Sequence, residues 1–146
     1  MKNEKLSSEG LIQFIKFGIV GVSNTAVDWV VFFMITQLII ADKSFEPTAK
    51  VISFLAAMLN SYIWNTIWTF KKQYEVSIKG GDTANAKMKI FVKFAIVSIA
   101  GWLINYFAFK YTRFNLNQGQ IVSLIVASGA ATFLNFFMNK LWTYKK

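Results

Sequence analysis

A single acidic residue, Asp28, lies within the long apolar segments of this sequence. On a helix it shares one face with residues at steps of three and four, namely Gly18, Gly21 and Thr25. An isolated charge near the centre of a bilayer costs about 2.5 to 3.5 kcal/mol, so the Asp28 carboxylate should face protein or water. There it can accept hydrogen bonds from sugar hydroxyls or hold the cation that accompanies a phosphate. The alternative is a hydrogen bond that only joins two helices.

Two amides are candidates for the partner of Asp28. Asn24 lies one helical turn earlier, and Asn105 occupies a similar position in the second half of the chain. Gly18 and Gly21 are expected to let two helices pack closely, as small residues commonly do in membranes.

The other candidate binding residues occur as matched pairs. They are Lys16 and Lys93, Asn65 and Asn139, and Trp68 and Trp142. Ammonium and amide groups donate hydrogen bonds to phosphate, and an indole ring can stack against a sugar or a prenyl unit. The alternative is anchoring, because tryptophan and lysine also accumulate at membrane interfaces for that reason alone.

The composition limits the class of protein fold that can hold these residues in place. Of 146 residues 55% are hydrophobic and 17% aromatic, with one proline, which for a short chain indicates membrane spans. The absence of cysteine and histidine excludes disulfides, thiolate chemistry and imidazole bases or ligands. No nucleophile, base and orienting group can be assembled from the remaining residues, so we expect neither an enzyme nor a metal or cofactor site.

Four apolar runs are long enough to span a bilayer. The sequence predicts an all-α integral membrane protein that forms a single domain over residues 1–146, with spans at 17–40, 48–70, 90–109 and 120–142 and a polar linker at 71–89. Residues 11–16 are expected to form a short interfacial helix, and the first span reads as an uncleaved signal anchor. A soluble bundle would place charges along the outer face of each helix, and these segments do not.

Lysine residues predict the orientation. They gather at the amino end, in the linker and at the carboxyl end, so both termini and the linker should be cytoplasmic and the protein should lie in the cell membrane. The net charge of +9 is distributed at the ends of apolar runs. Anionic phospholipids therefore explain this charge better than nucleic acid does.

The two halves of the chain resemble each other. Residues 15–20 match residues 92–97, and residues 64–72 match residues 138–146. Each half contains two predicted spans, so both halves should enter the membrane from the same side as a parallel repeat. Asp28 then falls opposite Asn105, a carboxylate against an amide.

These motifs resemble the GtrA-like family of small four-span proteins. The resemblance rests on the entry motif around Phe17 and Asp28 and on the exits Asn65-x-x-Trp68-x-Phe70 and Asn139-x-x-Trp142-x-Tyr144. It implies a part in moving polyprenyl-phosphate-linked sugars across the bacterial membrane, or in supporting the glycosyltransferases that use them, for O-antigen or teichoic acid glycosylation. A similar unit is attached to some dolichyl-phosphate mannose synthases. This chain departs from a symmetric motif, since Ser61 stands where the second half has Asn135, with Asn60 shifted by one.

The function that we expect is translocation of a polyprenyl-phosphate-linked sugar. Lysine, asparagine and tryptophan clusters would capture the phosphate and sugar, and the polar stripe of Asn24, Asp28 and Asn105 would offer a path. The enclosed volume of four helices is small, so we expect a homo-oligomer or a complex with a membrane glycosyltransferase. One alternative is a non-transporting anchor or assembly subunit for such an enzyme. Another, a small multidrug exporter, is disfavoured by the one-sided lysine distribution.

Overall fold

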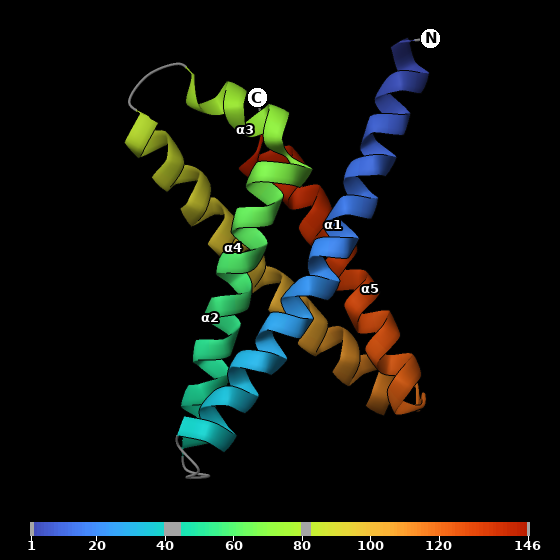
Figure 1. Ribbon diagram of the computed structural model, residues 1–146. Coiled ribbons are helices and arrows are strands. Elements are labelled where there is room, and N and C mark those ends of the chain that lie inside the picture. The colour runs from blue at the N-terminus through green and yellow to red at the C-terminus, as the bar shows by residue number, and fades with distance from the viewer. Residues whose placement is uncertain (1, 40–44, 80–82, 146) are drawn as a thin grey trace. The chain divides into compact units, whose positions relative to one another are not determined.

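The computed structural model describes residues 2–39, 45–79 and 83–145, and every regular element within these ranges is helical (Figure 1). The all-α class is thereby confirmed. The chain divides into two compact units, Met1–Lys71 and Lys72–Lys146. Each unit is built around one antiparallel helical hairpin, and we describe each by itself.

The first unit pairs α1 with α2. Its elements are α1 (Lys2–Phe33), the π-helical η1 (Met34–Ile39), α2 (Glu46–Trp64) and the π-helical η3 (Asn65–Thr69). A proline in the first turn starts α2, where its missing N–H costs nothing. α1 runs unbroken from Lys2, so residues 11–16 do not form a separate interfacial helix.

The second unit pairs α4 with α5. Its elements are α3 (Lys71–Ile78), α4 (Thr83–Lys110), η4 (Tyr111–Asn115), α5 (Gln120–Met138) and η5 (Asn139–Thr143). The turn between α4 and α5 contains Asn117 at φ 52°, a left-handed conformation that asparagine tolerates well. Most of the polar stretch predicted as a linker is helical, in α3 and in the first turns of α4.

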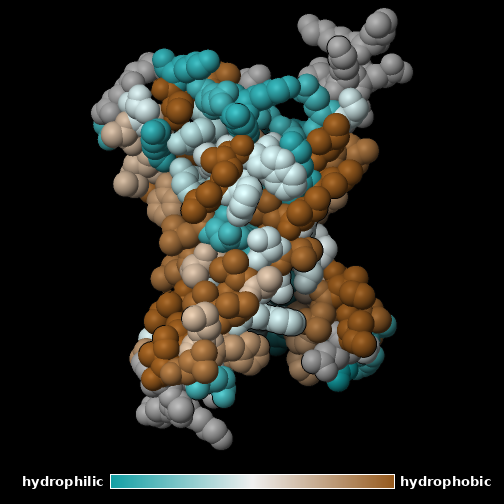
Figure 2. Space-filling model, viewed as in Figure 1, coloured by the Kyte–Doolittle hydropathy of each residue, from teal (hydrophilic) through white to brown (hydrophobic). Residues whose placement is uncertain are grey.

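Three helical stretches of the described chain are long and apolar enough to cross a membrane, namely Ser8–Ile39, Thr83–Asn115 and Ile121–Thr143. The predicted span 48–70 is helical but is not among them, because Lys50, Asn60 and Asn65 lower its hydropathy. The count of four spans therefore stays a prediction. Figure 2 shows apolar side chains over much of the helical surface, and Leu38 is 78% exposed, as expected of side chains that face lipid.

The same aromatic contact closes each hairpin. In the first unit the rings of Phe17 and Phe70 have centroids 6.2 Å apart, and in the second unit those of Phe94 and Tyr144 are 6.4 Å apart. All four side chains are buried. In each unit the contact joins the first half of the first long helix to the residue that follows the second. The two contacts lie at positions that are equivalent in the aligned halves of the sequence. The parallel arrangement of the two halves stays a prediction.

Close packing at glycine occurs at a different position from the one expected. A Cβ atom added at Gly18 or Gly21 would meet no atom within 4 Å, so these glycines do not provide close packing within the α1–α2 hairpin. Close packing there against another helix stays a prediction. The face of α1 that meets α2 is that of Phe17 and Val20, one position away. The close approach occurs at Gly101 in α4, where an added Cβ would overlap the side chain amide of Asn135 in α5.

Candidate functional site

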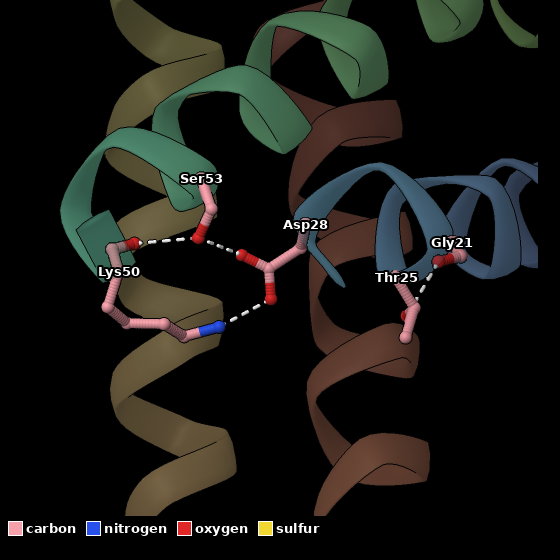
Figure 3. Close-up of polar contacts among 5 residues, drawn as sticks. All are labelled: Gly21, Thr25, Asp28, Lys50 and Ser53. Atoms are coloured by element: carbon pink, nitrogen blue, oxygen red, sulfur yellow. Dashed lines mark hydrogen bonds and ion pairs between the residues drawn. The ribbon is translucent and has the colours of Figure 1, made fainter. Parts of the chain in front are cut away.

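Asp28 is held by two residues of α2 (Figure 3). The Lys50 ammonium lies 2.5 Å from Asp28 Oδ2, and the Ser53 hydroxyl donates to Asp28 Oδ1 at 2.6 Å. The Ser53 hydroxyl also lies 3.0 Å from the Lys50 carbonyl, but its one proton favours the charged acceptor. The Asp28 side chain is 19% exposed, so its charge is compensated within the α1–α2 hairpin.

This finding corrects the expected partner of Asp28. Among the described residues Asn24 has no hydrogen bond to the carboxylate and pairs with Asn60 instead. A contact of Asp28 with Asn105, which belongs to the other unit, stays a prediction. Lys50 was not among the candidate binding residues; α2 begins at Glu46 and brings Lys50 onto its second turn. The spacing of Lys50 and Ser53, three residues apart at the start of a span, was the signal that could have identified the pair.

Asn24 is hydrogen-bonded to Asn60, the amide that stands one position away from the place of Asn135 in the repeat motif. The Asn60 Nδ2 donates to Asn24 Oδ1 at 2.8 Å and to the Ser23 hydroxyl at 3.2 Å. Thr25, on a neighbouring face, only donates back to the Gly21 carbonyl of its own helix. The α1–α2 seam therefore carries two polar clusters, one at Asn60 and one at Asp28.

Replacing Asn60 by leucine should lower the free energy of unfolding by about 1 kcal/mol, the usual value of an interhelical hydrogen bond in a membrane protein. Thr25→Val is the matched control, since it removes a hydroxyl that bonds only within its own helix, and it should be nearly neutral. Unfolding in mixed micelles by added dodecyl sulfate measures both. Equal losses for the two variants would contradict an interhelical role for Asn60.

The two lysine–tryptophan pairs are alike in geometry but differ in hydrogen bonding. Lys16 Nζ lies 5.2 Å from the ring centre of Trp68, and Lys93 Nζ lies 5.4 Å from that of Trp142, both within cation–π range. Lys93 Nζ also donates to the Trp142 carbonyl at 3.1 Å. Lys16 has no ion pair or hydrogen bond among the residues that the structure describes. Its ammonium is therefore the more available of the two.

A cavity of about 270 Å³ lies beside this available lysine. Its lining is predominantly apolar and consists of Ile19, Val20, Ser23, Trp64 and Trp68. Trp68 forms part of its wall and also carries Lys16 over its ring. An apolar cavity next to an unpaired cation suits an amphiphile with an anionic head.

Asn65 and Asn139 begin matching π-helical turns. Their Nδ2 groups donate to the carbonyls of Ser61 and Asn135 at 2.9 Å, while their own carbonyls accept from the N–H five residues on, at 2.7 and 2.8 Å. Both side chains are buried, and their Oδ1 atoms have no hydrogen-bond partner among the described residues. The structure thus gives both amides a part in shaping the turn, and their contact with phosphate stays a prediction.

Asn105 lies half-buried in α4. Its side chain has no hydrogen-bond partner within the described part of the chain. Of the nine predicted binding residues, the first unit brings Lys16 to Trp68 and places Asn24 and Asp28 on one seam, and the second brings Lys93 to Trp142. No group of three or more acidic residues within ranges 2–39, 45–79 and 83–145 is placed to hold a metal ion.

The long apolar helices define a multi-pass membrane protein. The chain belongs to the GtrA/DPMS transmembrane domain family, whose model matches residues 16–144. It is also 32% identical over 129 residues to the uncharacterized membrane protein YngA of Bacillus subtilis (strain 168), covering 88% of this chain and 77% of that protein. The family resemblance is confirmed, and it relates the protein to glycosylation.

Proposed function

We propose that the protein moves a polyprenyl-phosphate-linked sugar across the cytoplasmic membrane without covalent chemistry of its own. The polar seam between α1 and α2 is the observation that carries this proposal. It contains an unpaired ammonium at Lys16, the Asn24–Asn60 amide pair and the Asp28–Lys50 ion pair, in an otherwise apolar hairpin. Buried polar groups in a membrane are costly and commonly mark a substrate path.

The cytoplasmic end of the seam provides the capture site. The Lys16 ammonium donates to the phosphate, and the cavity between Val20, Trp64 and Trp68 takes the first apolar units of the carrier. Trp68 borders both regions, because its ring lies under the Lys16 ammonium and its side chain also lines the cavity. The remaining prenyl tail stays in lipid, so only the head group needs a polar path.

The seam then offers hydroxyls and amides to the sugar in turn. Asp28 lies twelve positions after Lys16, or about 18 Å along the helix, with the Asn24–Asn60 pair between them. Sugar hydroxyls both donate and accept, so they can exchange hydrogen bonds with amides and a carboxylate. This spacing lets the head group leave water in steps. In the orientation that we propose, both termini are cytoplasmic and Asp28 is nearer the outer surface.

The partners follow from the same arrangement. Anionic phospholipids hold the basic ends of the chain, and a second copy of the protein or a membrane glycosyltransferase completes the enclosure that one hairpin pair lacks. The alternative function, an anchor for a glycosyltransferase, is favoured by α3. This helix begins with Lys71 and Lys72, none of its residues is buried, and it therefore offers a basic surface to an enzyme.

Transbilayer movement of a polyprenyl-phosphate-linked sugar in proteoliposomes tests the proposal. We expect Asp28→Asn and Asp28→Ala to lower the rate about tenfold, because the seam loses the negative charge of Asp28. Thr25→Val, one turn earlier on α1, is the control and should keep the wild-type rate, since its hydroxyl bonds only its own helix.

Wild-type movement no faster than in protein-free vesicles would refute translocation. If, in addition, a glycosyltransferase co-purified with the Asp28→Asn protein as well as with wild type, the anchoring function would replace it.

A further inference from the structure

We propose that Lys50 forms a second site for the phosphate of a prenyl lipid, at the end of the α1–α2 hairpin opposite Lys16, and that Asp28 is the counter-ion that weakens this site. This inference rests on the proposed function and assigns it a release site. None of the residues that line the site, Trp29, Phe32, Phe33 and Lys50, was singled out from the sequence as a binding residue.

The site is a cavity of about 360 Å³ with an ammonium at one wall. Three aromatic side chains of α1 supply the apolar lining, and Lys50 reaches it from α2. Lys50 Nζ lies 5.9 Å from the ring centre of Phe32, and the lysine side chain is 58% exposed. Trp29 is 62% exposed. A head group can therefore reach the ammonium while the attached chain lies against the rings.

The two lysine residues of this hairpin lie toward its opposite ends. Lys50 and Trp68 are eighteen positions apart along α2 and η3, which corresponds to about 27 Å. The hydrocarbon core of a bilayer is about 30 Å thick. Lys16 lies over Trp68, and Asp28, which pairs with Lys50, is about 18 Å from Lys16 along α1. The hairpin therefore presents two cations with aromatic neighbours, separated by less than the full hydrocarbon thickness.

Asp28 sets how strongly the second site can hold an anion. Its carboxylate lies 2.5 Å from the same ammonium, and Ser53 keeps it in place from the other side. A phosphate that binds Lys50 must compete with this carboxylate and is repelled by it. Lys16 has no such competitor among the described residues. The difference makes the first site suited to capture and the second to release, since a transport site must let its ligand leave.

Photo-crosslinking with a prenyl monophosphate that carries a diazirine on its first isoprene unit tests this assignment. The full chain is reconstituted in phosphatidylcholine vesicles with the probe in both leaflets, so labelling requires no transport. The readout is the probe fraction that half-maximally labels the peptide containing Trp29 and Phe33. We expect Asp28→Asn to lower this fraction about fivefold, because the competing charge is gone.

Lys50 is removed in the Asp28→Asn background, so that no unpaired carboxylate is left behind. The Asp28→Asn, Lys50→Gln protein should need about tenfold more probe than Asp28→Asn alone, as expected for loss of a charged hydrogen bond. Lys110→Gln, which removes an exposed lysine at the end of α4, should match wild type. Circular dichroism of each variant confirms that it is folded.

Several results would overturn the proposal. They are equal labelling of Asp28→Asn with and without Lys50, weaker labelling of Asp28→Asn than of wild type, and competition by inorganic phosphate or phosphatidic acid as efficient as by unlabelled prenyl phosphate. Failure of the translocation assay with the expected labelling pattern would leave this site in place and remove only its role in transport.

Discussion

Lys50→Gln should lower the free energy of unfolding by about 2 kcal/mol. The substitution leaves the Asp28 carboxylate with only the Ser53 hydroxyl as a partner, in a side chain that is 19% exposed. Removing one member of a fully buried ion pair costs about 3 to 5 kcal/mol, whereas an exposed pair contributes about 0 to 1 kcal/mol. Because the Lys50 side chain is 58% exposed, the expected loss lies between these two values.

The double variant Asp28→Asn, Lys50→Gln should recover most of this loss, because both charges are then absent and two amides can bond each other. Unfolding by dodecyl sulfate in mixed micelles measures the single and double variants side by side. If the double variant were as unstable as Lys50→Gln alone, the cost would come from lost packing of the lysine stem and the ion pair would carry little stability.

Gly101→Leu should be the most damaging change in the second unit, with a loss of about 3 kcal/mol. A Cβ atom at position 101 already overlaps the side chain of Asn135, and a leucine adds three more carbons in the same direction. Overpacking of this kind costs about 1 to 3 kcal/mol when the neighbours can shift. Gly101 is buried where α4 meets α5, so a leucine must displace the Asn135 side chain from the helix interface.

Gly129→Leu is the matched control, because an added Cβ at this glycine of α5 meets nothing within 4 Å. It should be neutral or slightly stabilising, since leucine favours the helix. Thermal unfolding in detergent, followed by circular dichroism, compares the two. A smaller change, Gly101→Ala, adds only the Cβ atom that overlaps Asn135. Combining it with Asn135→Ala should restore the lost stability, because the shorter side chain leaves room for the new methyl group. Failure of this rescue would show that the clash lies elsewhere.

The sequence was sufficient to predict the helices and the matched ends of the two halves, because both leave local signals. Apolar runs of bilayer length predict α1, α4 and α5, and the aligned motifs predict that Phe70 and Tyr144 occupy equivalent positions. The two lysine residues were expected at matching positions, and so were the two tryptophan residues. The contact of each lysine with the tryptophan of its own unit was not predicted.

The partners of Asp28 and Asn24 could not be predicted from the same signals. Interhelical pairing depends on the rotation of each helix about its axis, and a shift of one position moves a side chain by about 100°. This rotation puts Val20, rather than the neighbouring Gly21, against α2 and brings Lys50 to Asp28. Asn60 is likewise shifted by one position from the motif of the second half, yet its side chain bonds Asn24. The packing of α1 against α2, and not the sequence motif, decides which residues face each other.

The wide turns at Asn65–Thr69 and Asn139–Thr143 make the hairpin ends sensitive to length. Each turn holds one residue more than the same stretch of α-helix would need, as the bonds from Phe70 and Tyr144 to the carbonyls five residues earlier show. Deleting that residue would improve the helix itself. It would also turn the following ring by about 100°, away from Phe17 in one unit and from Phe94 in the other. These ends should therefore accept many substitutions but no deletion.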